Sequence, residues 1–284
     1  MALRAKQPEK IEKRLKCLVF GDPGAGKTTC AAQFPQSYFV DCERGAENYD
    51  DILKKSKSVV FQTSDAEELI AEVRALATEK HEYRTLVVDP INVVEDDLIL
   101  KANNRYRVHE KEAGDMRVWR DRDYFYKRLF ALLFQLDMNV IMTCHGKVEY
   151  GDNMTKLGTT HAGWKRLPYM FDLVVEIKKL GTGAAAKRTA TIRKSRLKQF
   201  KDGAQFDWSY EAIASAYGSE LLSRAAVPIT LATPEQIVAI QTAITKAKLP
   251  DAWLEEKLEK AGVESLEDMP RDWAEALLAK IPKA

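Results

Sequence analysis

The sequence predicts an α/β fold in which a mainly parallel sheet is flanked by helices and followed by a small helical module. Three observations lead to this prediction. Short apolar runs alternate with amphipathic segments, a glycine-rich loop follows the first apolar run, and the residues after Pro228 have only helical patterns. Strands that alternate with helices pair in parallel through right-handed crossovers. With 284 residues, 45% of them hydrophobic, the chain can bury one sizeable core and a small appendage.

Four short apolar runs are expected to form the parallel strands: residues 16–20, 38–41, 85–89 and 139–143. The run at 85–89 is rich in β-branched residues, as is typical of a strand buried on both faces. Ser64 and Glu67 have the spacing of a capping box, which predicts that a helix begins after Ser64.

The later part of this core is expected to contain a helix, a loop and a strand pair. Residues 124–136 carry the helical pattern, and residues 146–167 are polar and dotted with glycine, which is typical of a loop. Residues 171–180 and 188–196 are expected to pair as strands across a glycine-containing turn.

The tail changes in character, and we expect a domain boundary between residues 1–229 and 230–284. Thr233, Pro234 and Gln236 are an N-cap, a proline at the first helical position and a capping-box partner. The tail has seven basic and ten acidic residues, so it is a mildly acidic helical module.

Composition limits where the protein acts. The net charge is only +2, so nucleic-acid binding cannot be inferred from the total and must depend on local charge. No apolar run reaches the roughly 18–20 residues of a membrane span, and the basic N-terminus lacks the apolar core of a signal peptide. Four widely spaced cysteines without a CxxC pair favour a reducing compartment. We therefore expect a cytoplasmic protein, with no membrane partner.

The strongest motif is a phosphate-binding loop between the first strand and the following helix. It matches G-x-x-x-x-G-K-[ST] at every fixed position: Gly21, Asp22, Pro23, Gly24, Ala25, Gly26, Lys27 and Thr28. Backbone N–H groups of such a loop converge on phosphate oxygens. Lys27 is expected to reach the β- and γ-phosphates, and the Thr28 hydroxyl to bind Mg²⁺. These residues, together with the adjoining Thr29, predict an ATP and Mg²⁺ site.

Carboxylates at the ends of two strands are the candidates for metal binding and water activation. Asp89 ends a buried strand and is expected to hold the metal in the Walker B role. Many P-loop motors place a glutamate directly after this aspartate, but Pro90 stands there. Glu43 follows the second strand, whose carboxyl end faces the nucleotide, so it is the first candidate for the catalytic base. Glu95 and Asp96 are weaker candidates.

From residue 16 to residue 210 the sequence resembles the RecA-like recombinase ATPases, and more closely the phage single-strand annealing proteins of the RecA-related Sak group. The segment 39–43 is similar to the recombinase segment that carries the catalytic glutamate, which implies that role for Glu43. The segment 140–145 resembles the strand that ends in a γ-phosphate sensor, which implies a sensor role for His145, although bacterial recombinases have glutamine there.

Two cations resemble the basic pair that reaches across a filament interface onto the ATP of a neighbouring subunit. They are Lys194 and Arg196, where Arg196 replaces one lysine of the pattern. The resemblance therefore implies a homo-oligomer, either a filament or a ring, with ATP between protomers. The DNA-binding loops do not match those of the recombinases, so strand exchange is not implied.

The loop at 146–167 is the candidate for binding single-stranded DNA. It carries basic residues interleaved with the aromatic residues Tyr150 and Trp164, a combination that suits a flexible backbone with exposed bases. The candidate contacts are Lys147, Lys156, Trp164, Lys165 and Arg166. The alternative is a mobile loop in which Trp164 packs into the core.

Three functions remain open at this stage. The leading one is a phage-type RecA-like ATPase that binds single-stranded DNA and promotes annealing or recombination. The second is a ring helicase or translocase, which requires sustained DNA-stimulated turnover. The third is a small-molecule P-loop kinase, which needs an arginine-bearing lid that is not evident in the sequence. A single-strand DNA-binding protein is a further candidate partner, through the tail.

Overall fold

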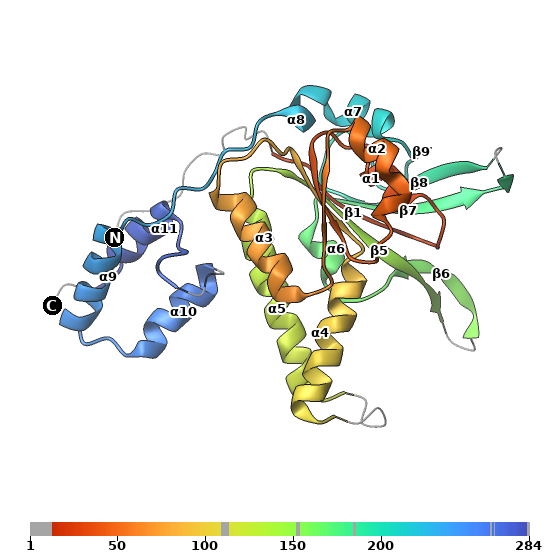
Figure 1. Ribbon diagram of the computed structural model, residues 1–284. Helices are drawn as coiled ribbons and strands as arrows, with labels where there is room; N and C mark the ends of the chain where they lie inside the picture. Colours follow the sequence, from red (N-terminus) through yellow and green to blue (C-terminus); the bar gives the residue numbers. More distant parts are fainter. Residues whose placement is uncertain are drawn as a thin grey trace.

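The computed structural model describes residues 13–108, 114–151, 154–183, 186–261, 263 and 265–282. Within these residues nine strands form one sheet, and helices cover both of its faces (Figure 1). The strands are β1 (Lys16–Gly21), β2 (Ser37–Asp41), β3 (Val59–Gln62), β4 (Thr85–Asp89), β5 (Asn139–Tyr150), β6 (Lys156–His161), β7 (Leu173–Leu180), β8 (Lys187–Ser195) and β9 (Gln205–Asp207).

The helices follow the same chain order and are mostly short. They are α1 (Lys27–Ala31), α2 (Asp50–Lys55), α3 (Ala66–Thr78), α4 (Ile91–Tyr106), α5 (Met116–Gln135), α6 (Leu167–Met170), α7 (Tyr210–Tyr217), α8 (Ser219–Ser223), α9 (Pro234–Lys246), α10 (Asp251–Ala261) and α11 (Arg271–Leu278), with a 3₁₀ turn η1 (Ala46–Tyr49) before α2. None of the helices in the described part is long and apolar enough to cross a membrane.

The strands lie in the order β3-β2-β4-β5-β1-β7-β8-β9, and β6 pairs with the outer part of β5. Strands β3 to β7 of this order are parallel, whereas β8 and β9 add an antiparallel edge. The strand that ends in Asp89 is thus separated from the strand before the phosphate loop by β5. The predicted α/β fold, a mainly parallel sheet flanked by helices, is confirmed.

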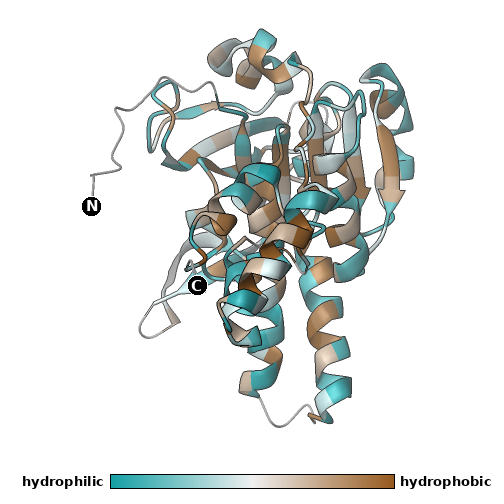
Figure 2. Cartoon of the chain, turned by 90° about the vertical axis from the view of Figure 1, so that its left-hand side faces the viewer, coloured by the Kyte–Doolittle hydropathy of each residue, from teal (hydrophilic) through white to brown (hydrophobic). Residues whose placement is uncertain are grey.

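Two apolar layers hold the helices to the sheet. On one face, α3, α4 and α5 pack against side chains such as Leu18, Val88 and Met142. On the other face, α1, α7 and α8 cover side chains such as Val19, Val87 and Ile141. Alternate residues of β1, β4 and β5 therefore face opposite layers, as expected for strands buried on both sides. In Figure 2 the hydrophobic colours concentrate on the central strands and on the inward sides of the helices.

Some local expectations were wrong. Residues 146–150 and 156–161 form paired strands rather than a loop, because β5 continues to Tyr150 and pairs antiparallel with β6. This hairpin and the one formed by β7 and β8 project from the same side of the molecule (Figure 1).

Helix α3 is capped by Asp65 rather than Ser64, since the Asp65 carboxylate accepts hydrogen bonds from the N–H groups of Glu67 and Glu68. The short edge strand β3 was not predicted.

The tail forms three helices around a small cluster of its own, which includes Ile240, Leu266 and Leu277. The predicted cap of α9 is present, because Thr233 and Gln236 make both hydrogen bonds of a capping box. The tail lies beside α3 and α5 (Figure 1), where Lys127 pairs with Glu259 at 2.9 Å. The boundary between residues 229 and 230 stays a prediction.

Candidate nucleotide site

The residues proposed to handle ATP lie where four parallel strands end. Gly21 at the end of β1 pairs in register with His145 of β5. Asp41 at the end of β2 pairs with Asp89 at the end of β4, and Glu43 follows two residues after Asp41. Because all four strands point the same way, their carboxyl ends bring these side chains to one edge of the sheet. The parallel topology thus assembles a site from segments as far apart in the sequence as Gly21 and His145.

The phosphate loop depends on glycine at specific positions. Gly24 and Gly26 have φ angles of 72° and 96°, a region that other residues adopt only with strain. A Cβ atom on Gly21 would lie 2.3 Å from the carbonyl oxygen of Ile177 in β7, so no side chain fits there. The Lys27 ammonium crosses the loop and donates to the carbonyls of Gly21 and Asp22 at 2.9 and 3.1 Å.

The electrostatics of Lys27 connect the loop to the nearby acids. Burial lowers the pKa of Lys27, whereas the negative charges of Asp89, Glu43 and Asp22 oppose this shift. Lys27 therefore lies within electrostatic reach of these three carboxylates. A charged lysine at this point suits the highly charged phosphate chain of a nucleotide.

Asp89 is almost fully buried and has hydroxyl groups as its neighbours. The hydroxyl of Thr143 in β5 donates to one of its carboxylate oxygens, and the Thr28 hydroxyl also hydrogen-bonds to it. Burial raises the pKa of Asp89, while these two hydrogen bonds and the charge of Lys27 act in the opposite direction. A carboxylate beside a threonine hydroxyl is the hard oxygen donor set that Mg²⁺ prefers, usually together with waters and phosphate oxygens. Thr28 and Asp89 therefore fit the proposed metal role.

Glu43 lies on a loop that Asp41 holds in place. The Asp41 carboxylate accepts hydrogen bonds from the N–H groups of Glu43, Gly45 and Ala46, at 3.3, 3.1 and 2.9 Å. The Glu43 carboxylate in turn contacts His145, with Oε1 2.8 Å from Nε2. Both side chains are about half exposed, so a water molecule can reach them. The proposed base and the proposed sensor are therefore in direct contact.

The weaker candidate Glu95 is not available for this chemistry. It is buried, and its Oε2 accepts hydrogen bonds from the Tyr126 hydroxyl at 2.7 Å and the Trp164 N–H at 3.0 Å. Burial raises its pKa. Sequence reasoning also missed Asn92, whose Oδ1 accepts the backbone N–H of His145 at 2.6 Å. The only signal for Asn92 was its position three residues after Asp89.

The two predicted trans-acting cations lie away from this site. Strand β8 runs antiparallel to β7, so Lys194 pairs with Val174, near the start of β7, whereas the phosphate loop is next to Ile177. Lys194 donates to the carbonyls of Pro168 and Phe171, both at 2.7 Å. Arg196 donates to the carbonyl of Tyr169 at 3.0 Å. The structure thus does not bring this pair to the nucleotide site of its own chain.

The predicted DNA contacts divide into exposed and buried residues. Lys147, Lys165 and Arg166 are exposed. Lys156 begins β6, but its side chain lies outside the described part of the structure. Trp164 is only 6% exposed and stacks on Tyr126 with ring centroids 4.5 Å apart, so the prediction that it stacks on bases is wrong.

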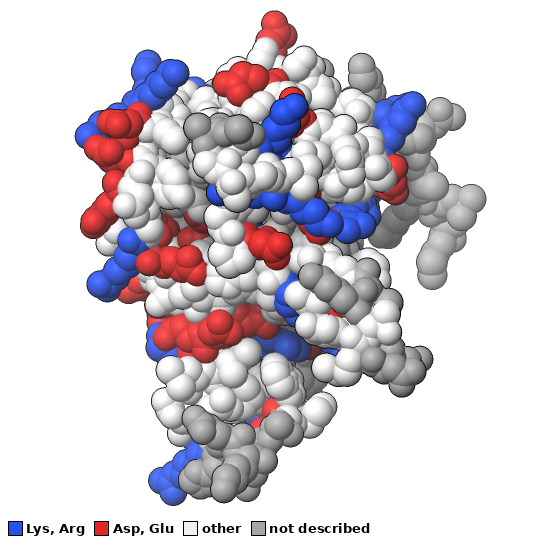
Figure 3. Space-filling view, turned by 90° about the vertical axis from the view of Figure 1, so that its right-hand side faces the viewer, with Lys and Arg blue, Asp and Glu red and all other residues white. Residues whose placement is uncertain are grey.

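The aromatic residue that is exposed on the hairpin is Tyr150, at 55%. It extends from β5 beyond Lys147, on the part of the strand that pairs with β6. On the face toward which both hairpins project, Lys and Arg side chains are interspersed with Asp and Glu (Figure 3). Among the described residues, this face therefore carries separate basic positions interspersed with acidic ones.

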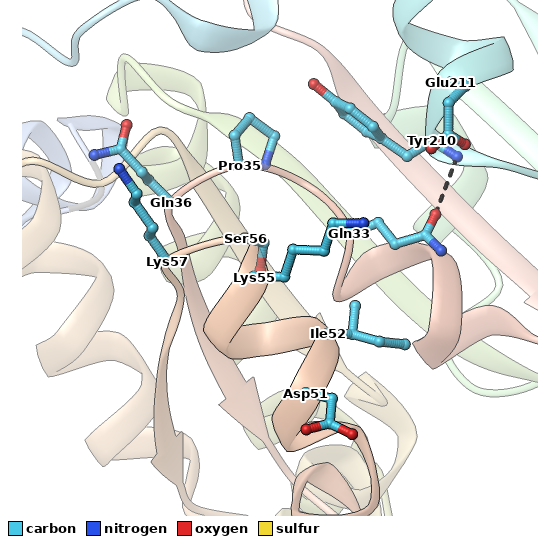
Figure 4. A pocket seen from close by; sticks show the side chains of 10 residues that line it. All are labelled: Gln33, Pro35, Gln36, Asp51, Ile52, Lys55, Ser56, Lys57, Tyr210 and Glu211. Atoms are coloured by element: carbon cyan, nitrogen blue, oxygen red, sulfur yellow. Dashed lines mark hydrogen bonds between the residues drawn. The ribbon is translucent and has the colours of Figure 1, made fainter.

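A cavity of about 640 Å³ lies beyond the C-terminal end of α1, between α2 and the start of α7. Figure 4 shows Lys55 and Tyr210 on its lining, together with Gln33, whose Oε1 accepts the Tyr210 N–H at 3.4 Å. None of the phosphate-loop residues lines it. The cavity is therefore separate from the site of Lys27 and Asp89.

Comparison with known proteins gives a family for most of this core. Residues 13–202 match the family described as AAA domain. Among solved structures, a KaiC-like protein from the hyperthermophilic archaeon Pyrococcus horikoshii matches with a TM-score of 0.44 and 16% identity. That match covers 68% of this chain and 84% of the archaeal one, and at this level it carries nothing about function. No curated protein sequence matches significantly.

Proposed function

The chain belongs to the AAA domain family, and from this membership and the geometry of the site we propose that it is an ATPase that binds single-stranded DNA and promotes annealing or recombination. The observation that carries the ATPase part is the convergence of Lys27, Asp89 and Glu43 at one sheet edge beside the phosphate loop. These groups supply the phosphate clamp, the metal ligand and the base that phosphoryl transfer to water requires.

In this proposal Glu43 orients the attacking water and accepts its proton, because its carboxylate is half exposed and held by His145 at 2.8 Å. Lys27 turns from the carbonyls of Gly21 and Asp22 to the β- and γ-phosphates. Mg²⁺, when bound by Thr28 and Asp89, neutralises charge on the phosphate oxygens. Loss of the γ-phosphate changes what His145 contacts and so reports the nucleotide state.

The DNA part of the proposal rests on the continuity of β5. His145 lies at the nucleotide site, and two residues later the same strand presents the exposed Lys147. The side chains of Lys165 and Arg166 follow at the other end of the hairpin. Cations attract the phosphate backbone, and Tyr150 can stack on a base. Because one strand joins both features, a change at His145 can alter the hairpin that binds DNA.

The proposal includes neighbouring copies of the chain. Lys194 near the end of β8, and Arg196 just after it, lie too far from the phosphate loop to act on the nucleotide of their own protomer. We propose that they act on the site of an adjacent protomer in a filament or ring, where they stabilise charge on the transferring phosphoryl group. The oligomer is therefore part of the proposed active site.

Single-stranded DNA binding, measured over a salt series with and without a non-hydrolysable ATP analogue, tests the proposal. We expect the analogue to change the affinity. A Lys147→Ala, Lys165→Ala, Arg166→Ala triple variant should bind more weakly, and its log–log salt dependence should fall by about one unit per lost phosphate contact. A Lys246→Ala, Lys248→Ala variant in the tail is the matched control.

The outcomes separate the candidate functions. Equal DNA affinity of the triple variant and the wild type would remove the hairpin from the DNA-binding surface. No DNA binding under any condition, combined with transfer of phosphate to a small molecule, would favour the kinase alternative. Processive unwinding with rapid DNA-stimulated turnover would favour the helicase alternative.

A further inference from the structure

One arginine of β8 lies directly against the phosphate loop of its own chain. A Cβ atom placed on Gly26 would be 2.6 Å from Cδ and 2.7 Å from Nε of Arg188. The side chain of Arg188 therefore crosses the loop at Gly26, immediately before Lys27. Gly26 has a φ angle of 96°, a backbone conformation that favours glycine at this position.

The backbone around Arg188 is held to the loop by Trp208. The backbone N–H of Trp208 donates to the carbonyl of Arg188 at 2.9 Å, and its indole N–H donates to the carbonyl of Gly26 at 3.1 Å. Trp208 is buried, so these two hydrogen bonds fix the distance between β8 and the loop. The fold therefore holds the backbone of Arg188 close to Gly26.

Arg188 has no carboxylate partner among the described residues, and its side chain is exposed. The contrast is with Arg193 on the same strand, which forms an ion pair with the buried Glu176. A guanidinium that is unpaired, partly positioned and next to a phosphate-binding loop is suited to a phosphate group, because its planar donors match phosphate oxygens in pairs.

We propose that Arg188 binds the phosphate chain of the nucleotide held by its own protomer, as a second cation beside Lys27. This inference rests on the proposed function of the loop as a nucleotide site. It assigns to the start of β8 a role in cis that differs from the trans role of Lys194 and Arg196. Arg188 raises the affinity for nucleoside di- and triphosphates, because these present two or more phosphates to the loop.

The experiment measures ATP and ADP binding by isothermal titration calorimetry with Mg²⁺ for the wild type and four variants. Arg188→Ala removes the side chain, and Arg188→Met keeps a stem of similar length without the charge. Arg188→Lys keeps a charge without the planar donors. Lys187→Ala is the matched control, because Lys187 is exposed and points to the opposite side of the strand. The midpoint of thermal unfolding is measured for each protein.

We expect Arg188→Ala and Arg188→Met to bind both nucleotides about 10- to 100-fold more weakly, as is usual for the loss of a charged hydrogen-bond donor. Arg188→Lys should recover part of this loss, and Lys187→Ala should bind like the wild type. Thermal unfolding should be unchanged in all four variants.

Two results overturn the inference while leaving the nucleotide site intact. One is wild-type affinity in Arg188→Met, which would show that the stem packs on Gly26 and that the charge is not used. The other is an equal loss in Lys187→Ala, which would indicate a general charge effect. If the wild type binds neither nucleotide, the proposed function fails, and the inference fails with it.

Discussion

The two ends of strand β8 carry cations in opposite situations. At its beginning, Arg188 lies over Gly26 of the phosphate loop and has no ion-pair partner among the described residues. At its end, Lys194 and the nearby Arg196 donate to the backbone carbonyls of Pro168, Phe171 and Tyr169. The first end is next to the nucleotide site of its own chain, and the second end is next to the start of β7.

The cause of this difference is the direction of the strand. Strands β1 and β7 are parallel, so their carboxyl ends meet at the site, but β8 runs back antiparallel to β7. The cations at the beginning and at the end of β8 therefore lie at opposite ends of the parallel strands. Arg188 is therefore placed to act within one protomer, whereas Lys194 and Arg196 can meet a nucleotide only if another protomer brings one.

The largest effect is expected from Lys27→Ala, because the proposed roles of the cations at both ends of β8 require a nucleotide bound at the phosphate loop. The ammonium at the centre of the loop is lost while strand β8 is unchanged, so nucleotide binding should fall below detection in calorimetry. The variant should keep the wild-type unfolding midpoint. Unchanged ATP affinity in a folded Lys27→Ala protein would place the nucleotide elsewhere.

Arg196→Ala should come next, with ATP hydrolysis reduced about 10³-fold, which is the lower range for loss of an arginine supplied in trans. ATP binding should remain close to that of the wild type. When Arg196→Ala and Lys27→Ala proteins are assembled together, some activity should return, because the first supplies an intact loop and the second supplies intact cations.

The same mixing experiment tests whether Arg188 acts within its own protomer. A mixture of Arg188→Ala and Lys27→Ala should stay at the activity of Arg188→Ala alone, since no partner can replace a cation that acts in cis. Restored activity in this mixture, or none in the Arg196→Ala mixture, would contradict the division of β8 into a cis end and a trans end.

Glu43→Gln should slow hydrolysis by about 10²-fold or more, the usual contribution of a general base, while ATP binding is retained. Glu43 lies on the loop after β2 in contact with His145 of the same chain. It should therefore behave like Arg188 in mixtures with Lys27→Ala and show no recovery. Normal turnover of Glu43→Gln in single-turnover assays would assign the base to another group.

The smallest effect concerns pH. Burial, followed by the charge of Arg196, lowers the pKa of Lys194 below its ordinary value of 10.5. Lys194 therefore loses its charge at a lower pH than an ordinary lysine, and hydrolysis should decline a few-fold as the pH approaches 10.5 from below. Lys194→Arg should lack that part of the decline, because arginine stays protonated.

As the pH rises, the contribution of Lys194 to the free energy of unfolding should increase, whereas its contribution to hydrolysis should decrease. Since the unfolded chain binds the Lys194 proton more tightly than the folded chain does, this group makes the free energy of unfolding rise with pH between the two pKa values. Urea unfolding of the wild type and Lys194→Arg over the same pH series measures this difference. A steeper alkaline loss of activity in Lys194→Arg than in the wild type would rule out this assignment of the pH effect.

Much of the site could be predicted because its residues follow directly from strand ends. The loop from Gly21 to Thr28, Asp89 and Glu43 each come at or just after the end of an apolar run, and parallel strands place such ends together. The same reasoning gave the helical tail, where the capping box of Thr233 and Gln236 is a local signal that does not depend on tertiary contacts.

The parts that could not be predicted depend on long-range packing. Trp164 has the sequence neighbours of a DNA-binding aromatic, yet Tyr126 and Glu95 from distant helices bury it. The hairpin of β5 and β6 carries a polar and glycine-rich sequence that has the composition of a loop. The position of Arg188 over Gly26 follows from the register between β7 and β8 and from Trp208, none of which a local pattern encodes.

The first turns of α4 have a consequence for how the site communicates. Asp89 ends β4 immediately before this helix, Asn92 accepts the N–H of His145, and Glu95 accepts the N–H of Trp164. The first turns of α4 therefore connect Asp89, His145 and Trp164 through one rigid element. If the proposed function holds, we expect a shift of Asp89 on metal binding to reach His145 through Asn92 and Trp164 through Glu95.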